Sequence, residues 1–122
     1  MQGISPLNIF AKILRGEIPS KKIYEDEYVL SFYDVNPQKK IHALVIPKGK
    51  YIDLDDFSMN ASSVEMVGLL KGINIVAKKL CISVDTGKGY RALANISEDG
   101  GQEVPHLHFH LFGGEKIGKM VG

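Results

Sequence analysis

Three of the protein's four histidines alternate with apolar residues near the C-terminus, in the stretch His106-Leu107-His108-Phe109-His110. Because side chains alternate between the two faces of a strand, the spacing predicts that the three imidazoles share one face. Neutral imidazole is a nucleophile and, with an ordinary pKa of about 6.5, it also exchanges protons at neutral pH. Three imidazoles are also enough for a catalytic zinc site. The pattern favours nucleophilic and acid–base catalysis at phosphorus, with a metal site and a structural role as alternatives.

A polar loop rich in glycine, residues 97–102, leads directly into these histidines. Converging backbone N–H groups in such a loop can hold a phosphate group, although a plain hairpin loop would look the same. Asp99 and Glu103 would repel a phosphate, so we expect the backbone amides to do the binding.

Periodicity and turn residues predict an α+β domain with a mainly antiparallel sheet of five strands and two helices. The expected elements are a helix capped by Asn8 and ended by Gly16, strands over 22–25, 28–34 and 43–47, a helix from Ser62 to about Leu80, and strands over 90–96 and 104–112. His42 would stand at the mouth of the third strand. The long helix should bury one apolar face made of Val67, Leu70, Ile73, Val76, Ala77 and Leu80.

Composition limits the class of protein. A chain of 122 residues is expected to form one domain, 1–122, and a formal net charge of +1 gives no bulk attraction to nucleic acid or to a membrane surface. Cys81 is the only cysteine, so no internal disulfide forms. With no signal peptide and no apolar run of membrane-spanning length, we expect a cytoplasmic protein.

Several motifs together resemble the histidine triad (HIT) superfamily. The stretch His106-Leu-His-Phe-His-Leu-Phe is similar to the family signature in which histidines alternate with hydrophobic residues. Gly113-Gly114 resembles the Hint-like (histidine triad nucleotide-binding) branch, and His110 argues against the galactose-1-phosphate uridylyltransferase branch, which has glutamine there. Further matching motifs, in the right order, are Asn8-Ile-Phe-Ala-Lys-Ile, Gly16-Glu-Ile-Pro-Ser, Phe32-Tyr-Asp-Val-Asn-Pro-Gln, His42-Ala-Leu-Val-Ile-Pro-Lys, Gly89-Tyr-Arg, Asn95 and Gly100-Gly-Gln-Glu-Val.

This resemblance implies a homodimer whose two sheets join into a continuous ten-stranded sheet, and a hydrolase of purine nucleoside phosphoramidates that releases AMP or GMP. His108 would be the nucleophile and form a covalent nucleotidyl-histidine intermediate, with its ring held by the backbone carbonyl of His106. His110 would contact the phosphate and assist the leaving group, and His42 would join the proton-handling network. A dinucleoside polyphosphate hydrolase and a nucleotide-binding adaptor with incidental activity remain the alternatives.

The resemblance also assigns binding residues. Asn95 and the backbone around Gly101, Gln102 and Glu103 would bind the phosphate, and Asp34 would accept hydrogen bonds from the ribose hydroxyls. An apolar slot for the purine base would be made by Ile9, Phe10, Ile18, Phe32 and Val35, residues that by spacing alone would simply be core. Some members build a structural zinc site from paired cysteines near the N-terminus, but residues 8–11 contain none. We therefore expect no metal and no required cofactor.

Overall fold

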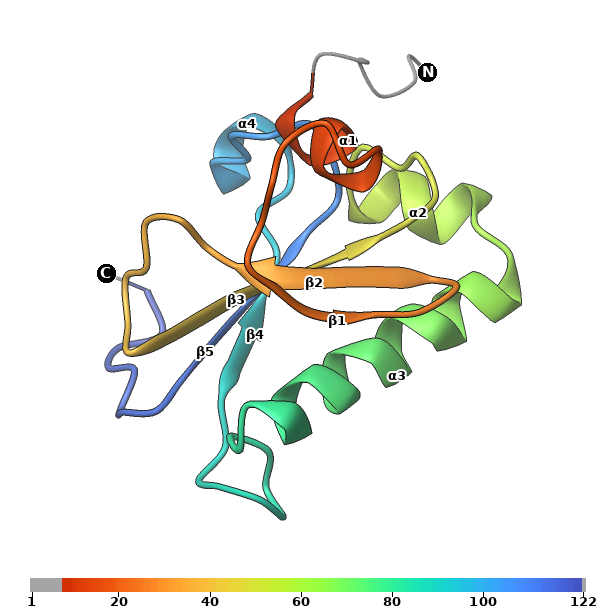
Figure 1. Cartoon of the computed structure of the whole chain (residues 1–122). Coiled ribbons are helices and arrows are strands. Elements are labelled where there is room, and N and C mark those ends of the chain that lie inside the picture. The colour runs from red at the N-terminus through yellow and green to blue at the C-terminus, as the bar shows by residue number, and fades with distance from the viewer. Residues whose placement is uncertain (1–7, 122) are drawn as a thin grey trace.

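The computed structural model describes residues 8–121. Its elements are α1 (Ile9–Leu14), β1 (Lys22–Glu25), β2 (Val29–Tyr33), β3 (Ile41–Pro47), α2 (Leu54–Asn60), α3 (Ser63–Lys79), β4 (Arg91–Leu93), α4 (Ser97–Gly100) and β5 (Phe109–Gly113). Figure 1 shows one twisted sheet with α3 running along one side of it and α1 on the other.

The five strands form a single sheet in the order β1-β2-β3-β5-β4, and every neighbouring pair is antiparallel. The expected α+β class and antiparallel five-stranded sheet are therefore confirmed. β5, which carries the end of the histidine motif, lies between β3 and β4, so its residues are hydrogen-bonded on both sides. The register places His110 opposite Leu44 of β3 and opposite Leu93 of β4.

Each face of the sheet has its own apolar cluster. The cluster under α3 consists of Val29, Ala43, Val45, Phe57, Leu69, Ile73, Val76, Leu107 and Leu111. The cluster on the α1 side consists of Phe10, Leu30, Phe32, Leu44 and Ile46. Since residues paired across antiparallel strands share a face, His110 lies on the α1 side with Leu44. The histidines thus occupy a face that is partly covered by α1.

Local signals explain α1. The side chain of Asn8 accepts hydrogen bonds from the backbone N–H groups of Phe10 and Ala11, which satisfies two donors of the first turn. The helix ends before Gly16, whose φ of +76° suits a residue without a Cβ. Phe10 is the buried residue of this short helix and points into the α1-side cluster.

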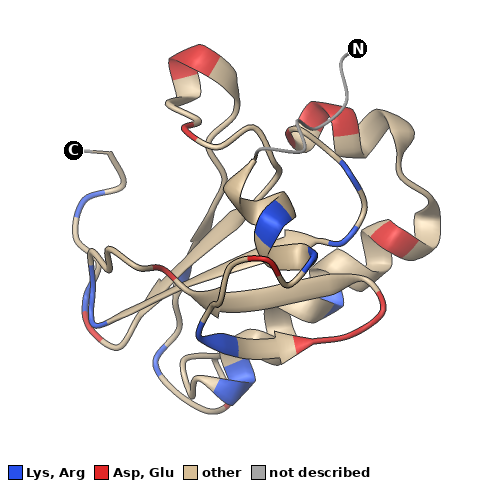
Figure 2. Ribbon diagram, turned by 45° about the horizontal axis from the view of Figure 1, so that its top comes forward, with Lys and Arg blue, Asp and Glu red and all other residues tan. Residues whose placement is uncertain are grey.

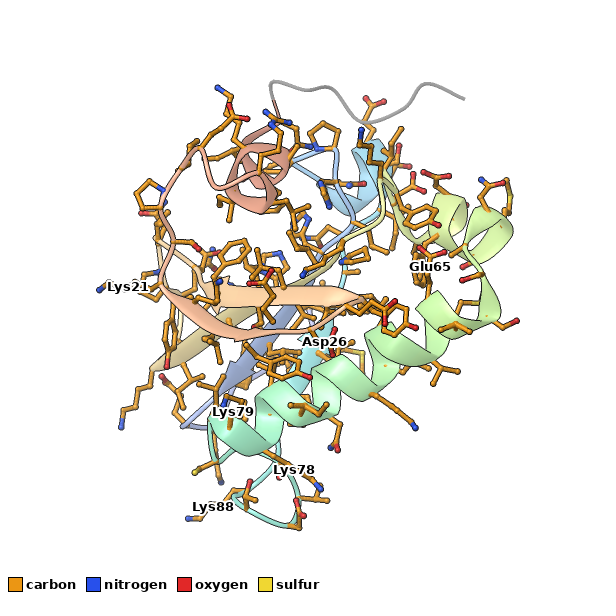
Figure 3. All side chains as sticks on the ribbon, turned by 45° about the vertical axis from the view of Figure 1, so that its right-hand side comes forward. Lys21, Asp26, Glu65, Lys78, Lys79 and Lys88 are labelled. Carbon is orange, nitrogen blue, oxygen red and sulfur yellow. The ribbon has the colours of Figure 1, made fainter. Side chains whose placement is uncertain are left out.

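The long helix α3 begins at a complete capping box between Ser62 and Glu65, as the sequence predicts. In Figure 3, Glu65 lies near the beginning of α3, and Lys78 and Lys79 lie at its end, where positive charge interacts favourably with the helix dipole.

The face that α3 buries differs from the expected one. Val67 and Leu70 are 51% and 68% exposed, and the buried residues are Leu69, Gly72, Ile73, Val76 and Ala77. The packing face is centred on a glycine, because a Cβ on Gly72 would lie 2.7 Å from Cγ2 of Val29. A pattern that counts only large apolar residues misses this close approach of helix and sheet.

Four elements of the structure differ from those that the sequence predicts. The chain contains four helices within the described residues rather than two, because Asp53 caps the short helix α2 and residues 97–100 form α4 instead of an open loop. Strand β4 spans only Arg91–Leu93 rather than 90–96. Strand β5 begins at Phe109 rather than at Val104, since Pro105 has no N–H for a ladder and the N–H of His106 bonds to the oxygen of Val104 in a turn.

Among the described residues, no helix is both long enough and apolar enough to cross a membrane.

Candidate active site

The histidine motif enters the sheet from a turn, and its side chains still alternate. Leu107 and Leu111 are buried in the α3-side cluster, as expected. The rings of His108 and His110 are neighbours, with centroids 5.0 Å apart, and the ring of Phe10 lies against both His106 and His108. His106 and His108 are only 1% and 6% exposed, so these imidazoles sit in a largely dry environment.

Hydrogen bonds determine which nitrogen of His108 carries the proton. Its Nδ1 lies 2.6 Å from the backbone oxygen of His106, the contact that the resemblance implies. A carbonyl oxygen can only accept, so Nδ1 donates and the neutral ring keeps its lone pair on Nε2. His108 thus has the tautomer that a nucleophile at Nε2 requires.

A second chain of hydrogen bonds orients His42 and His110. The backbone N–H of Gln38 donates to Nδ1 of His42 over 3.2 Å, so the neutral ring of His42 carries its proton on Nε2. That Nε2 lies 2.9 Å from Nδ1 of His110. Nδ1 of His110 is then an acceptor, and the proton of the neutral His110 ring is on Nε2, the remaining nitrogen. The structure thus places an N–H donor, Nε2 of His110, on a ring that neighbours His108.

Burial keeps all four rings neutral at neutral pH. It lowers the pKa of His106 to about 4, and together with the neighbouring rings of His108 and His42 it lowers the pKa of His110 to about 4. Burial also lowers the pKa of His108 and that of His42, although the charge of Asp34 opposes both shifts. A lone pair on His108 is therefore available without prior deprotonation.

Asp34 lies beside this network rather than in open solvent. Its Oδ1 accepts a hydrogen bond from the N–H of Asn36, and its Oδ2 lies 3.4 Å from Nε2 of His42. The side chain is 19% exposed, which leaves carboxylate surface for a ligand. Asp34 therefore both shapes the turn after β2 and supplies negative charge at the edge of the site.

One set of side chains in the described residues could in principle hold a metal ion. Ligand atoms of Asp34, His42 and His110 lie within 4.8 Å of one another. However, a neutral imidazole that binds a metal through Nε2 carries a proton on Nδ1 and donates it to an acceptor. Nδ1 of His42 faces the N–H of Gln38, which is a donor. The surroundings of His42 therefore fit a proton-relay histidine better than a metal ligand.

The loop before the histidines is held by the side chain of Gln102. Its Nε2 donates to the oxygens of Ile52 and Val104, and its Oε1 accepts from the N–H of Ser97. Gly101 ends α4 with a φ of +75°. The amide side chain of Gln102 is thus used in shaping the loop, and the backbone N–H groups of Gly101 and Gln102 already donate to the oxygens of Glu98 and Ser97.

The remaining predicted phosphate ligands flank this loop. Asn95 is half-buried two residues after β4, and a Cβ on Gly100 would lie 3.5 Å from its carbonyl carbon, so the loop folds back onto it. Glu103 is exposed, and its charge acts to raise the pKa of His108. A pocket of about 350 Å³ lies beside the loop and is lined by Ile52, Asp53, Ser97, Glu98, Gln102, Glu103 and Pro105. Figure 2 shows acidic residues on α4.

The residues assigned to the base slot differ in burial. Phe10 and Phe32 are buried together, with ring centroids 5.6 Å apart, and Phe10 contacts the triad directly. Ile18 is half-buried between α1 and β1. Ile9 and Val35 are 47% and 90% exposed, so they belong to the surface around the site rather than to its interior.

Comparison with known proteins agrees with this geometry. A model of the HIT domain matches residues 15–117. The chain belongs to the HIT family. A HIT-like protein of Azospirillum brasilense is 51% identical over 116 residues, covering 95% of this chain and 93% of that protein.

Solved structures of HIT proteins are also similar. A HIT family hydrolase from Clostridium thermocellum has 36% identity and a TM-score of 0.84, with 96% of this chain and 98% of that chain covered. A histidine triad nucleotide-binding protein from Candida albicans has 33% identity and a TM-score of 0.74, with 85% and 72% covered. The predicted membership of the HIT superfamily is confirmed.

Two groups of this HIT site were not found from the sequence. The backbone N–H of Gln38 selects the tautomer of His42, and the backbone oxygen of Pro47 lies 3.4 Å from Nε2 of His106. Both are main-chain groups, so no side-chain pattern could have indicated them.

Proposed function

We propose that the protein hydrolyses purine nucleoside 5′-phosphoramidates, with His108 as the nucleophile. The observation that carries the proposal is the hydrogen bond from Nδ1 of His108 to the oxygen of His106, which leaves the lone pair on Nε2. Attack by Nε2 on the α-phosphorus forms a nitrogen–phosphorus bond as the bond to the leaving amine breaks. Water then cleaves the nucleotidyl-histidine and releases AMP or GMP.

His110 is assigned to the leaving group. Its Nε2–H donates a hydrogen bond to the leaving nitrogen, and the hydrogen bond from Nε2 of His42 holds Nδ1 of His110 as an acceptor. The amine takes its proton from solvent water in the first step, and the water that attacks in the second step returns a proton to solvent. No step requires a metal ion or another cofactor.

The pocket beside the loop supports an amine leaving group. Asp53, Glu98 and Glu103 contribute carboxylates to its lining, and Pro105 connects it to the first triad histidine. Negative charge attracts a cationic group, so a leaving group such as a lysyl amine is favoured over an anionic nucleotide. The other end of the substrate is assigned to Asp34 for the ribose, and to Phe10 and Phe32 for the base, whose apolar contacts suit either purine.

The deciding experiment uses metal-free protein and two substrates, an adenosine 5′-phosphoramidate and a diadenosine polyphosphate, and follows AMP release from each. We expect rapid release from the phosphoramidate in the presence of a chelator. Preference for the polyphosphate would replace the proposed substrate while keeping His108 as nucleophile. Binding of AMP without turnover of either substrate would favour an adaptor.

We further propose a homodimer. A continuous ten-stranded sheet requires one edge strand from each protomer, and the edges of this sheet are β1 and β4. Light scattering coupled to size-exclusion chromatography tests this directly, since a mass equal to one 13.4 kDa chain at micromolar concentration would contradict it.

A further inference from the structure

Two buried polar atoms near the triad have no hydrogen-bond partner among the described residues, and they are complementary. One is Nδ2 of Asn8, a donor, and the other is Nδ1 of His106. Asn8 is 6% exposed and His106 is 1% exposed. Buried polar groups in native proteins are almost always paired, so both atoms call for an explanation.

The orientation of the Asn8 amide is determined by α1. Its Oδ1 accepts hydrogen bonds from the N–H groups of Phe10 and Ala11, at 2.7 Å and 3.2 Å. Two donors converge on this atom, so it must be the oxygen, and a flipped amide is excluded. The NH₂ group of Asn8 is therefore the unpaired part, and it needs an acceptor.

The orientation of the His106 ring is determined by β3. Its Nε2 lies 3.4 Å from the oxygen of Pro47, which can only accept, so Nε2 carries the proton. Burial lowers the pKa of His106 to about 4, so the ring carries no second proton at neutral pH. Nδ1 of His106 is therefore a bare lone pair that needs a donor.

Both atoms belong to residues that contact Phe10. Asn8 precedes Phe10 by two residues and binds its backbone, and the ring of Phe10 packs edge-on against the ring of His106 with centroids 6.1 Å apart. The rest of this region is the α1-side cluster, whose buried members are Phe10, Leu30, Phe32, Leu44 and Ile46. These side chains contain no donor and no acceptor, so the two unpaired atoms are the natural partners of each other.

We propose that Asn8 is a positioning residue of the triad, whose amide supplies a hydrogen bond to Nδ1 of His106 through one bridging water molecule. Buried waters commonly join polar groups that cannot reach each other directly. His106 would then be held from both sides, by Pro47 and by Asn8. Because the backbone oxygen of His106 orients the ring of His108, α1 would control the aim of the nucleophile, an inference that rests on the proposed function.

The direct test is nitrogen NMR of protein labelled with ¹⁵N-histidine. In the wild type we expect Nδ1 of His106 to have the chemical shift of a hydrogen-bonded acceptor. Asn8→Ser keeps an oxygen for the helix cap but removes the amide donor, so the signal should move to the position of a free lone pair. Asn8→Asp places a carboxylate beside that lone pair, so His106 should bind a proton at higher pH. An unchanged Nδ1 signal in Asn8→Ser would overturn the proposed link.

Kinetics tests the consequence for catalysis. For Asn8→Ser we expect kcat to fall at least fivefold on the adenosine phosphoramidate while KM changes less than twofold. Ser62→Ala is the control, because it removes the cap of α3 without touching the triad, and its kcat should match the wild type. A shifted Nδ1 signal with unchanged kcat would overturn the positioning role. If the wild type releases no AMP, the proposed hydrolase fails, and the NMR result still decides the link between Asn8 and His106.

Discussion

Nε2 of His42 donates a hydrogen bond to Nδ1 of His110 over 2.9 Å, which joins the only histidine outside the motif to the last histidine inside it. The two residues are 68 positions apart and meet because β3 and β5 are neighbours in the sheet. The direction of the bond follows from the N–H of Gln38 on the other side of His42. A backbone group in a turn thus determines where a proton is available at the site.

Replacing this donor should slow catalysis. We expect His42→Asn to lower kcat by roughly 10²-fold, the usual contribution of a group that supports proton transfer, because it removes the N–H opposite Nδ1 of His110. His42→Gln is the matched control, since its longer side chain can place an amide N–H near the former Nε2 and should retain more activity. Equal losses in the two variants would indicate that only packing against Phe112, whose ring centroid is 4.3 Å away, had been disturbed.

The nucleophile should be indispensable. His108→Ala is expected to reduce AMP release by at least about 10³-fold, because no other ring in the site offers a free Nε2 lone pair held by a carbonyl at Nδ1. His108 is only 6% exposed, and its ring contacts the ring of Phe10. We therefore also expect His108→Ala to lower the melting temperature. His108→Gly with added imidazole separates the two effects, since recovered turnover would show a folded site that lacks only the ring.

The sheet and the triad could be predicted because both are encoded by local patterns. Alternating histidines placed Leu107 and Leu111 in the core, and the capping box marked the start of α3. The helix faces could not be predicted as well, since Gly72 packs on Val29 and turns Val67 and Leu70 outward. A glycine carries no apolar signal, although it is what allows the helix to approach the sheet.

The resemblance predicts a catalytic role for the four histidines, but it does not predict the protonation of every ring. For His108 the resemblance implies the contact with the carbonyl of His106, and the structure shows it. The tautomers of His42 and His106 depend on main-chain groups of Gln38 and Pro47 that approach only after folding. The exposure of the side chains assigned to the apolar slot could not be predicted either. Ile9 and Val35 have the right residue types, yet helix phase and loop geometry leave them on the surface.

Recognition of the ribose can be tested at Asp34. We expect wild-type protein to bind AMP about 10- to 100-fold more tightly than its 2′,3′-dideoxy analogue, the range for hydrogen bonds to a charged group. Asp34→Ala should abolish this preference. Asp34→Asn retains an oxygen for the N–H of Asn36 and serves as the control for the turn. Equal affinity of the wild-type protein for both ligands, measured by calorimetry, would remove Asp34 from the ribose site.

The free energy of unfolding should decrease as the pH is lowered through a window set by the histidines. The pKa values of His106 and His110 are lowered to about 4 in the folded protein, whereas in the unfolded chain they return to about 6.5. Above pH 6.5 both states are neutral and stability is constant. Between pH 6.5 and 4 the unfolded chain binds more protons, so the free energy of unfolding decreases as the pH falls. At pH 5, a fully buried ring such as His106 lowers the free energy of unfolding by about 2 kcal/mol relative to neutral pH. The half-buried ring of His110 lowers it by less.

Urea unfolding at pH 7 and pH 5 measures this loss above the range in which carboxylates titrate. His110→Gln removes one of the depressed rings while leaving an amide that can pack beside His42, so its stability should depend less steeply on pH than that of the wild type. His106 remains in this variant, and part of the loss should therefore persist. A wild-type free energy of unfolding that stays flat from pH 7 to pH 5 would mean that these rings take up protons in the folded state, and the neutral tautomers assigned to the site would be wrong.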